Sequence, residues 1–170
     1  MLKTLSFLIL MAITTKIGWG QNLVWPEVLE DIRARYPEVQ QLSTDSLASW
    51  LDAGDKKQPI LLDIREENEY AVSHLAGARH LPPDATDFSL LDGVPRDTPL
   101  VLYCSVGYRS SKMAQQLQEM GFTDVSNLEG SIFTWANEGR PVIHEGEPVH
   151  AVHPYNKVWG MLLKKELRSP

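Results

Sequence analysis

The sequence predicts an α/β domain whose strands form a parallel sheet. Two short apolar runs, residues 60–64 and residues 100–103, are each preceded by a proline, Pro59 and Pro99. Nearly continuous apolar runs of this length are typical of strands buried on both faces, as in a parallel sheet. Segments with apolar residues at helical spacing lie between and after these runs. Strand and helix therefore alternate along the chain, which is the pattern of the α/β class.

The other elements follow from apolar spacing and from residues that start or stop helices. Pro26 and Pro37 bracket a segment with helical spacing and are suited to the start and stop of a short first helix. Ser43 is suited to cap the next helix, which is expected to end near Gly54, and Gly121 closes a later one. The expected elements are helix 26–36, strand 39–42, helix 44–54, strand 60–64, helix 70–74, strand 100–103, helix 110–121 and a tail helix within 156–168.

Length and composition indicate one globular domain with short extensions. The 170 residues are 43% hydrophobic and 22% charged, which is enough apolar material to close a core at this size. No internal repeat or long polar linker divides the chain. The formal charge is -6, or -8 once Lys3 and Lys16 are left out, so we expect no nucleic-acid partner.

The first 20 residues have the features of a secretory signal peptide. Lys3 precedes an apolar run at residues 5–13, and small residues Gly18 and Gly20 flank Trp19 before the expected cut. The run is too short to span a bilayer, which needs about 20 residues, although an uncleaved anchor is an alternative. We therefore expect cleavage after Gly20 and an exported protein, periplasmic or secreted.

Cys104 is the candidate nucleophile. It is the chain's single cysteine, so no intramolecular disulfide can form. It directly follows the apolar run 100–103 and precedes a helix, which places a thiol at the carboxyl end of a strand and opposite a helix N-terminus. Partial positive charge there favours the thiolate, Gly107 allows the sharp turn of an anion-binding nest, and Arg109 adds a cation. The alternative is that Cys104 is a small buried hydrophobe and Arg109 a surface charge.

The segment Cys104-Ser105-Val106-Gly107-Tyr108-Arg109-Ser110 resembles the active-site loop of rhodanese sulfurtransferases. Upstream, Leu62-Asp63-Ile64-Arg65 with Glu69-Tyr70, His74-Leu75-Ala76-Gly77-Ala78 and Leu81-Pro82 resemble a family signature. Downstream, Leu128-Glu129-Gly130 with Trp135 and Gly139-Arg140-Pro141-Val142 resemble another. The likeness covers about residues 40–142. Two departures are Ser73 and Ser131, where the family usually has glycine, and serine pays a steric cost wherever that glycine had positive φ.

The resemblance implies a rhodanese-like three-layer domain, a small parallel sheet with helices on both faces. It would occupy residues 39–143, between an N-terminal helical extension at 21–38 and a C-terminal extension at 144–170. Cys104 and Arg109 would be catalytic, and the loop residues that bind substrate would be Ser105, Val106, Gly107, Tyr108 and Ser110. Asp63 would support the site structurally, and we read Arg65 and Glu69 as a structural pair and His74 as a packed, hydrogen-bonded residue.

The implied activity is transfer of a sulfane sulfur from a donor such as thiosulfate to a thiol or cyanide, through a Cys104 persulfide and without a cofactor. A protein thiol is a further candidate acceptor. The loop disfavours a phosphatase, because Arg109 stands five positions after the cysteine and related phosphatases have six. A persulfide carrier or partner-binding module remains the alternative. We expect no metal site, because His144, His150 and His153 match no recognised ligand spacing. The basic tail is expected to pack on the domain, with membrane association as the alternative.

Overall fold

The computed structural model describes residues 23–54 and 57–170. The expected leader, residues 1–20, lies outside the described residues. Within the described ranges, no helix is both long enough and apolar enough to cross a membrane.

A five-stranded parallel sheet forms the centre of the domain, with strand order β1-β5-β4-β2-β3. Its register places Asp63 of β2 opposite Tyr103 of β4, so both strands end at the same edge. A separate hairpin pairs the antiparallel strands β6 and β7. The strands are β1 (Gln40–Leu42), β2 (Ile60–Asp63), β3 (Arg79–His80), β4 (Leu100–Tyr103), β5 (Val125–Leu128), β6 (Val142–His144) and β7 (Glu147–Val149).

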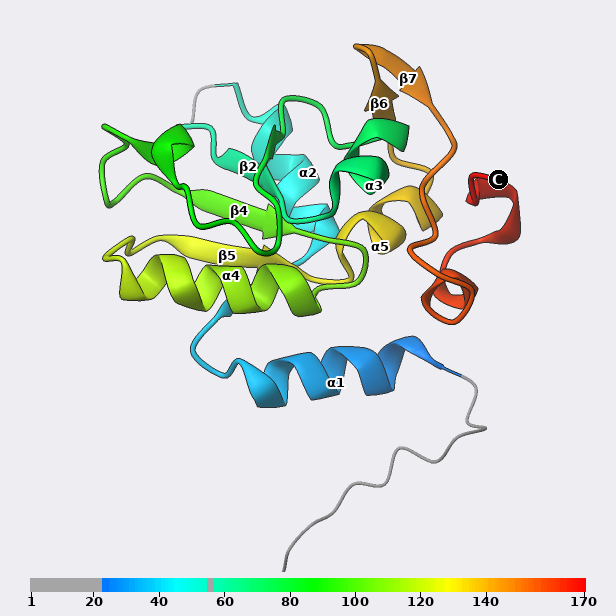
Figure 1. The fold of residues 1–170 in the computed structure, drawn as a ribbon, viewed down its shortest axis with the longest axis horizontal. Coiled ribbons are helices and arrows are strands. Elements are labelled where there is room, and N and C mark those ends of the chain that lie inside the picture. The colour runs from blue at the N-terminus through cyan, green and yellow to red at the C-terminus, as the bar shows by residue number, and fades with distance from the viewer. Residues whose placement is uncertain (1–22, 55–56) are drawn as a thin grey trace, which may run out of the picture.

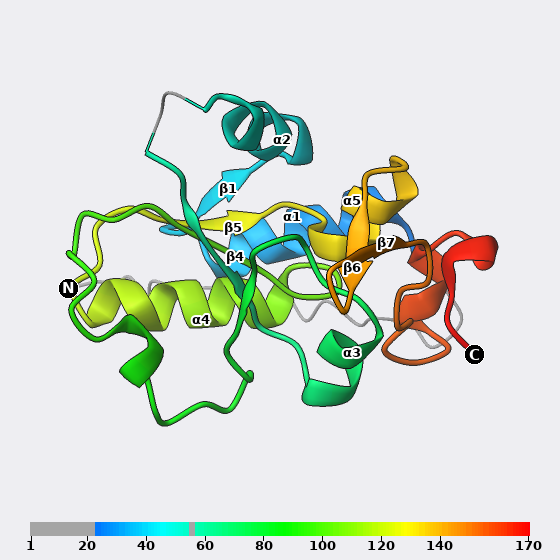
Figure 2. The same cartoon turned by 90° about the horizontal axis from the view of Figure 1, so that it is seen from above.

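Helices cover both faces of the sheet, so the predicted α/β fold class is confirmed. Helices α2 and α4 lie on opposite sides of the strands (Figure 2). Alternate strand residues divide between two cores: Leu61 and Val101 pack with α2 and α5, whereas Leu62 and Leu102 pack with α4. The helices are α1 (Trp25–Arg35), α2 (Thr44–Asp52), α3 (Glu67–Val72), α4 (Tyr108–Glu119) and α5 (Ser131–Asn137), with 3-10 turns η1 (Ser89–Leu91), η2 (Trp159–Leu162) and η3 (Lys165–Leu167).

Two expected helix boundaries were wrong. The helix after Cys104 begins at Tyr108 rather than near Ser110, with Gly107 as its N-cap, so Arg109 belongs to the first turn. Helix α3 ends at Val72, and His74 instead bridges Ile143 of the hairpin. Residues 144–149 complete that hairpin, so the chain beyond residue 143 does not begin with a helix.

The tail does not form the single helix that its apolar run indicated. It consists of the two short turns η2 and η3, and it lies beside α5 (Figure 1). The reason is tertiary: Asn137 of α5 donates to the carbonyl of Leu162 at 2.8 Å and accepts from the amide of Lys164 at 2.8 Å. In a continuous helix, this carbonyl and this amide would form hydrogen bonds within the helix. The helical pattern is interrupted between them, and Leu162 and Leu163 are buried in the core there.

Candidate functional site

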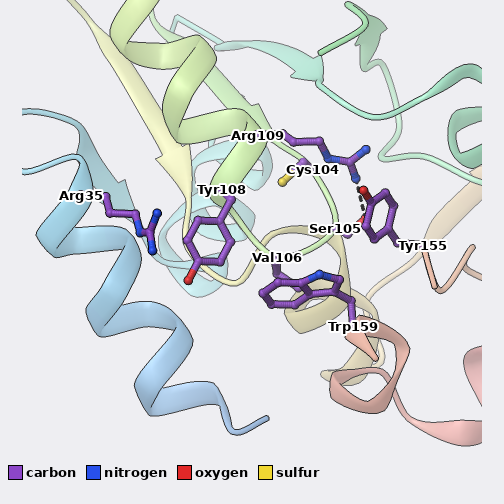
Figure 3. A pocket seen from close by; sticks show the side chains of 8 residues that line it. All are labelled: Arg35, Cys104, Ser105, Val106, Tyr108, Arg109, Tyr155 and Trp159. Atoms are coloured by element: carbon purple, nitrogen blue, oxygen red, sulfur yellow. Dashed lines mark hydrogen bonds between the residues drawn. The ribbon is translucent and has the colours of Figure 1, made fainter. Parts of the chain in front are cut away.

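Cys104 lies at the sheet edge where β4 ends and the loop to α4 begins. Its side chain is 1% exposed, yet it contributes to a pocket of about 330 Å³. The pocket is lined by Arg35, Cys104, Ser105, Val106, Tyr108, Arg109, Tyr155 and Trp159 (Figure 3). The structure therefore brings the predicted loop residues together around the thiol.

Hydrogen-bond donors of the loop surround the sulfur. The Gly107 amide donates to Cys104 Sγ at 3.1 Å, and Ser110 Oγ lies 3.4 Å from the same sulfur. Burial opposes ionisation of this thiol, but the charge of Arg109 and the bonds from Ser110 and Gly107 outweigh it. As a result, the pKa of Cys104 lies below its usual value.

The backbone conformation at position 107 favours glycine. Its φ is +126°, and a Cβ built there would lie 3.1 Å from Ile32 Cδ1 and 3.2 Å from Asn127 Nδ2. The positive φ strains any other residue, and a Cβ would fit only if Ile32 or Asn127 shifted by a few tenths of an ångström. Of the N–H groups predicted to form an anion nest here, the Gly107 amide contacts Cys104 Sγ.

Sequence comparison identifies the family of this chain. A sequence model described as the rhodanese-like domain matches residues 43–138. The chain belongs to the rhodanese-like family. A sulfurtransferase of Allochromatium vinosum is 31% identical over 105 residues, which cover 62% of this chain and 95% of that protein. The thiosulfate sulfurtransferase GlpE of Pseudomonas fluorescens is 32% identical over 90 residues, covering 52% and 81%.

A longer relative and two solved structures also match this domain. The chain matches 29% of the length of "probable adenylyltransferase/sulfurtransferase MoeZ" of Mycobacterium tuberculosis, at 31% identity over 67% of this chain. A rhodanese-like domain from Anabaena superposes with a TM-score of 0.56 at 25% identity, covering 69% of this chain and 90% of that one. The polysulfide-sulfur transferase of Wolinella succinogenes shares the fold, with a TM-score of 0.55 at 20% identity, covering 72% and 90%.

Arg109 of the rhodanese loop is not the surface charge of the alternative reading, because it is paired with a buried carboxylate. Its guanidinium forms two hydrogen bonds to the Glu69 carboxylate, at 2.5 and 2.8 Å, and a third to Ser105 Oγ at 2.9 Å. Ser105 Oγ in turn donates to Glu69 at 2.8 Å. Burial opposes ionisation of Glu69, but Arg109 outweighs it and holds the pKa of that carboxyl below its usual range.

Glu69 therefore pairs with Arg109, and the expected pair of Arg65 with Glu69 was wrong. Arg65 instead forms a fork with Asp63, with Nε to Oδ1 at 2.8 Å and Nη2 to Oδ2 at 2.6 Å. Both side chains are fully buried, and Arg65 also donates to the carbonyl of Ser73 at 2.6 Å. This pair ties the end of β2 to the residue that follows α3.

The two serines named above as departures from the resemblance differ in their backbone. Ser73 has φ of −172°, an extended conformation open to any residue, and it donates to the carbonyl of Ala151 at 2.7 Å. Ser131 has φ of +52° and pays the steric cost expected of a non-glycine residue. In return its hydroxyl accepts from the amide of Cys104 and donates to the carbonyl of Leu128, each at 3.1 Å. Ser131 thus fixes the backbone of Cys104, a role the sequence did not indicate.

The outer wall of the pocket consists of residues that sequence reasoning missed. Arg35 comes from α1, whereas Tyr155 and Trp159 come from the tail, and Figure 3 shows all three around the mouth. Trp159 meets Tyr108 edge to face with ring centroids 5.6 Å apart, and the Arg109 guanidinium lies 4.6 Å from the Tyr155 ring centre. No local sequence pattern marks these residues as part of a site. The apolar residues of the tail were the one signal, because they indicated that the tail packs on the domain.

The predicted packing role of His74 agrees with its contacts. Its ring stacks on Tyr70 with centroids 4.0 Å apart, and Nδ1 lies 3.2 Å from the Tyr70 carbonyl. Among the described residues, no group of three or more histidine, cysteine or acidic side chains is arranged to hold a metal ion.

Proposed function

We propose that this protein is a sulfurtransferase in which Cys104 takes a sulfane sulfur from a donor such as thiosulfate and passes it to a thiol or cyanide. The thiolate attacks the outer sulfur of the donor, the donor's sulfur–sulfur bond breaks, and sulfite leaves with the electron pair. Cys104 then carries the sulfur as a persulfide. Attack by the acceptor on the outer sulfur returns the Cys104 thiolate.

The observation that carries this proposal is the environment of Cys104 Sγ. The sulfur lies on a pocket at the start of α4, and the Gly107 amide is 3.1 Å from it. Burial opposes ionisation of the thiol, but Arg109, Ser110 and Gly107 outweigh it, so the pKa of Cys104 lies below the usual thiol value. First-turn N–H groups of a helix have no partner within the helix, so they are available to the outer sulfur of a persulfide. Membership of the rhodanese-like family and relatives described as sulfurtransferases support the same chemistry.

The decisive variant is Cys104→Ser. Its side chain is similar in size, but a serine alkoxide is inaccessible near neutral pH, so sulfur transfer from thiosulfate to cyanide should vanish. Intact mass should show one added sulfur on the wild type after donor treatment and none on the variant. Equal melting temperatures would show that the fold is intact, and full activity in the variant would falsify the nucleophile assignment.

A persulfide carrier has the same loop as a turnover enzyme, and kinetics separate the two. With excess thiosulfate and cyanide, a sulfurtransferase forms many thiocyanate ions per chain at a constant rate. A carrier forms a burst of one per chain and then stops until a partner thiol is supplied. Sustained thiocyanate formation is the result that our proposal requires.

We also propose that the protein acts outside the cytoplasm, on the basis of the leader-like composition of residues 1–20. Intact mass after expression in a host with a secretory pathway should correspond to a chain that begins at Gln21. A retained leader with the protein in the membrane fraction would contradict this proposal and favour an anchor.

A further inference from the structure

The pocket above Cys104 takes its outer wall from segments outside the family match. Residues 43–138 supply the loop, but Arg35, Tyr155 and Trp159 lie before or after that range. Figure 3 shows Tyr155 and Trp159 of the tail on one side of the thiol and Arg35 of α1 on the other. The chemistry at the sulfur therefore belongs to the family domain, whereas the shape and charge of the entrance are set by the two extensions.

Among the described residues that line the entrance, both arginines are paired with carboxylates. Its two cations each have a carboxylate partner: Arg109 is bound twice by Glu69, and Arg35 Nε donates to Asp31 at 2.6 Å. Asp31 also accepts from the Tyr108 hydroxyl at 2.6 Å, which holds that ring at the pocket. Attack of a thiolate on the thiosulfate dianion gathers three negative charges, and such a step needs a net positive surrounding.

The rest of the pocket suits an apolar body. Tyr108 and Trp159 form an edge-to-face pair, and Val106 and the Tyr155 ring line the pocket beside Ser105. The volume of about 330 Å³ falls in the range of pockets that hold small organic molecules. Most of this space would stay empty above a bound thiosulfate.

We propose that the sulfur donor of this site is a low-molecular-weight organic persulfide, R–S–SH, whose R group packs on Trp159, Tyr108 and Tyr155. This inference rests on the proposed sulfurtransferase function and names its donor class. The Cys104 thiolate bonds to the terminal sulfur of R–S–SH, the R–S to sulfur bond breaks, and the thiolate R–S⁻ leaves with the electron pair. The products are the protonated Cys104 persulfide and R–S⁻, and charge and atoms balance without an oxidant.

The test compares three donors on the full protein: benzyl persulfide, methyl persulfide and thiosulfate. The readout is the second-order rate constant for addition of one sulfur to Cys104, followed by intact mass, with Cys104→Ser as the blank. Burial of a phenyl ring contributes about 1.5–3 kcal/mol, so benzyl persulfide should react at least about tenfold faster than methyl persulfide. Thiosulfate should be the slowest donor.

The aromatic wall is tested with Trp159→Ala and its matched control Val158→Ala. Trp159 lines the pocket, whereas the neighbouring Val158 side chain is 57% exposed and does not line it. Trp159→Ala should remove most of the benzyl-over-methyl preference, and Val158→Ala should keep it. Trp159→Phe, which retains a ring, should restore the preference even if Trp159→Ala loosens the tail.

Asp31→Asn tests whether charge at the entrance selects the donor. The substitution removes the carboxylate that pairs with Arg35 while keeping the side-chain shape. The ratio of the thiosulfate to the benzyl persulfide rate constant should rise about fivefold. Asp45→Asn changes the net charge equally at a site 86% exposed and away from the pocket, and should leave this ratio unaltered.

The results separate this inference from the proposed function. If no donor adds sulfur to Cys104, the sulfurtransferase proposal itself fails. If thiosulfate reacts faster than benzyl persulfide and the Trp159 variants leave the donor ranking unchanged, the donor class is wrong while the nucleophile stands.

Discussion

Replacing Arg109 with alanine should lower the stability of the fold, although Arg109 lines a pocket. The Glu69 side chain is 1% exposed and that of Arg109 is 21% exposed, so the substitution leaves a buried carboxylate without its cation. Breaking a buried ion pair costs about 3–5 kcal/mol. Ser105 still donates to Glu69, and water can enter through the partly exposed side, so we expect about 2–3 kcal/mol here.

For a domain of this size, each kcal/mol lowers the melting temperature by about 2–4 °C, so Arg109→Ala should lower it by about 4–12 °C. Arg33→Ala is the control, because Arg33 pairs with Glu129 but its side chain is 54% exposed. An exposed pair of this kind contributes at most about 1 kcal/mol. Thermal unfolding followed by circular dichroism measures both variants.

The pH dependence of the loss identifies Glu69 as its source. In the wild type, burial raises the pKa of Glu69, but Arg109 outweighs burial and the folded-state pKa is lowered. The stability that the ionised Glu69 contributes is therefore present above its unfolded-state pKa of about 4.3, and it is lost as pH falls through the lower folded-state pKa. Without Arg109, burial raises that pKa, and stability is lost as pH rises through it. The deficit of Arg109→Ala should therefore be largest near pH 7 and shrink toward pH 4. A deficit that is constant over this range, or no larger than that of Arg33→Ala, would refute the argument.

Three further outcomes are expected. The rate of Cys104 alkylation by iodoacetamide should rise with pH through a midpoint below the ordinary thiol value of 9.0, because burial is outweighed by Arg109 and the loop donors; a midpoint above 9.0 contradicts the lowered pKa. Gly107→Ala should cost about 1–3 kcal/mol, since φ is +126° and Ile32 is 3.1 Å from the new Cβ, and urea unfolding measures the loss. Deletion of residues 155–170 removes two buried leucines and should lower the melting temperature by about 10 °C; an unchanged value would show that the tail does not stabilise the domain.

The sequence alone was sufficient for the features that depend on neighbouring residues. Apolar runs that each follow a proline predicted β2 and β4, and the position of Cys104 after β4 predicted a thiol at the start of a helix. Gly107 three residues later predicted the turn that brings its amide to the sulfur. These predictions succeeded because strand periodicity, helix starts and tight turns are determined within a few residues.

Only the tertiary structure decided which distant groups meet. Glu69 and Arg109 are 40 positions apart, and nothing local distinguished this pair from the expected pair of Glu69 with Arg65. The tail was expected to be one helix, but Asn137 donates to Leu162 and accepts from Lys164, which interrupts it, and Trp159 lies at the pocket beside the active-site loop. Apolar spacing indicates that a segment is buried, but packing across the whole domain determines which surface it is buried against. The nucleophile was therefore visible in the sequence, whereas the walls and the charge balance of its pocket emerged only when α1, α3 and the tail converged on it.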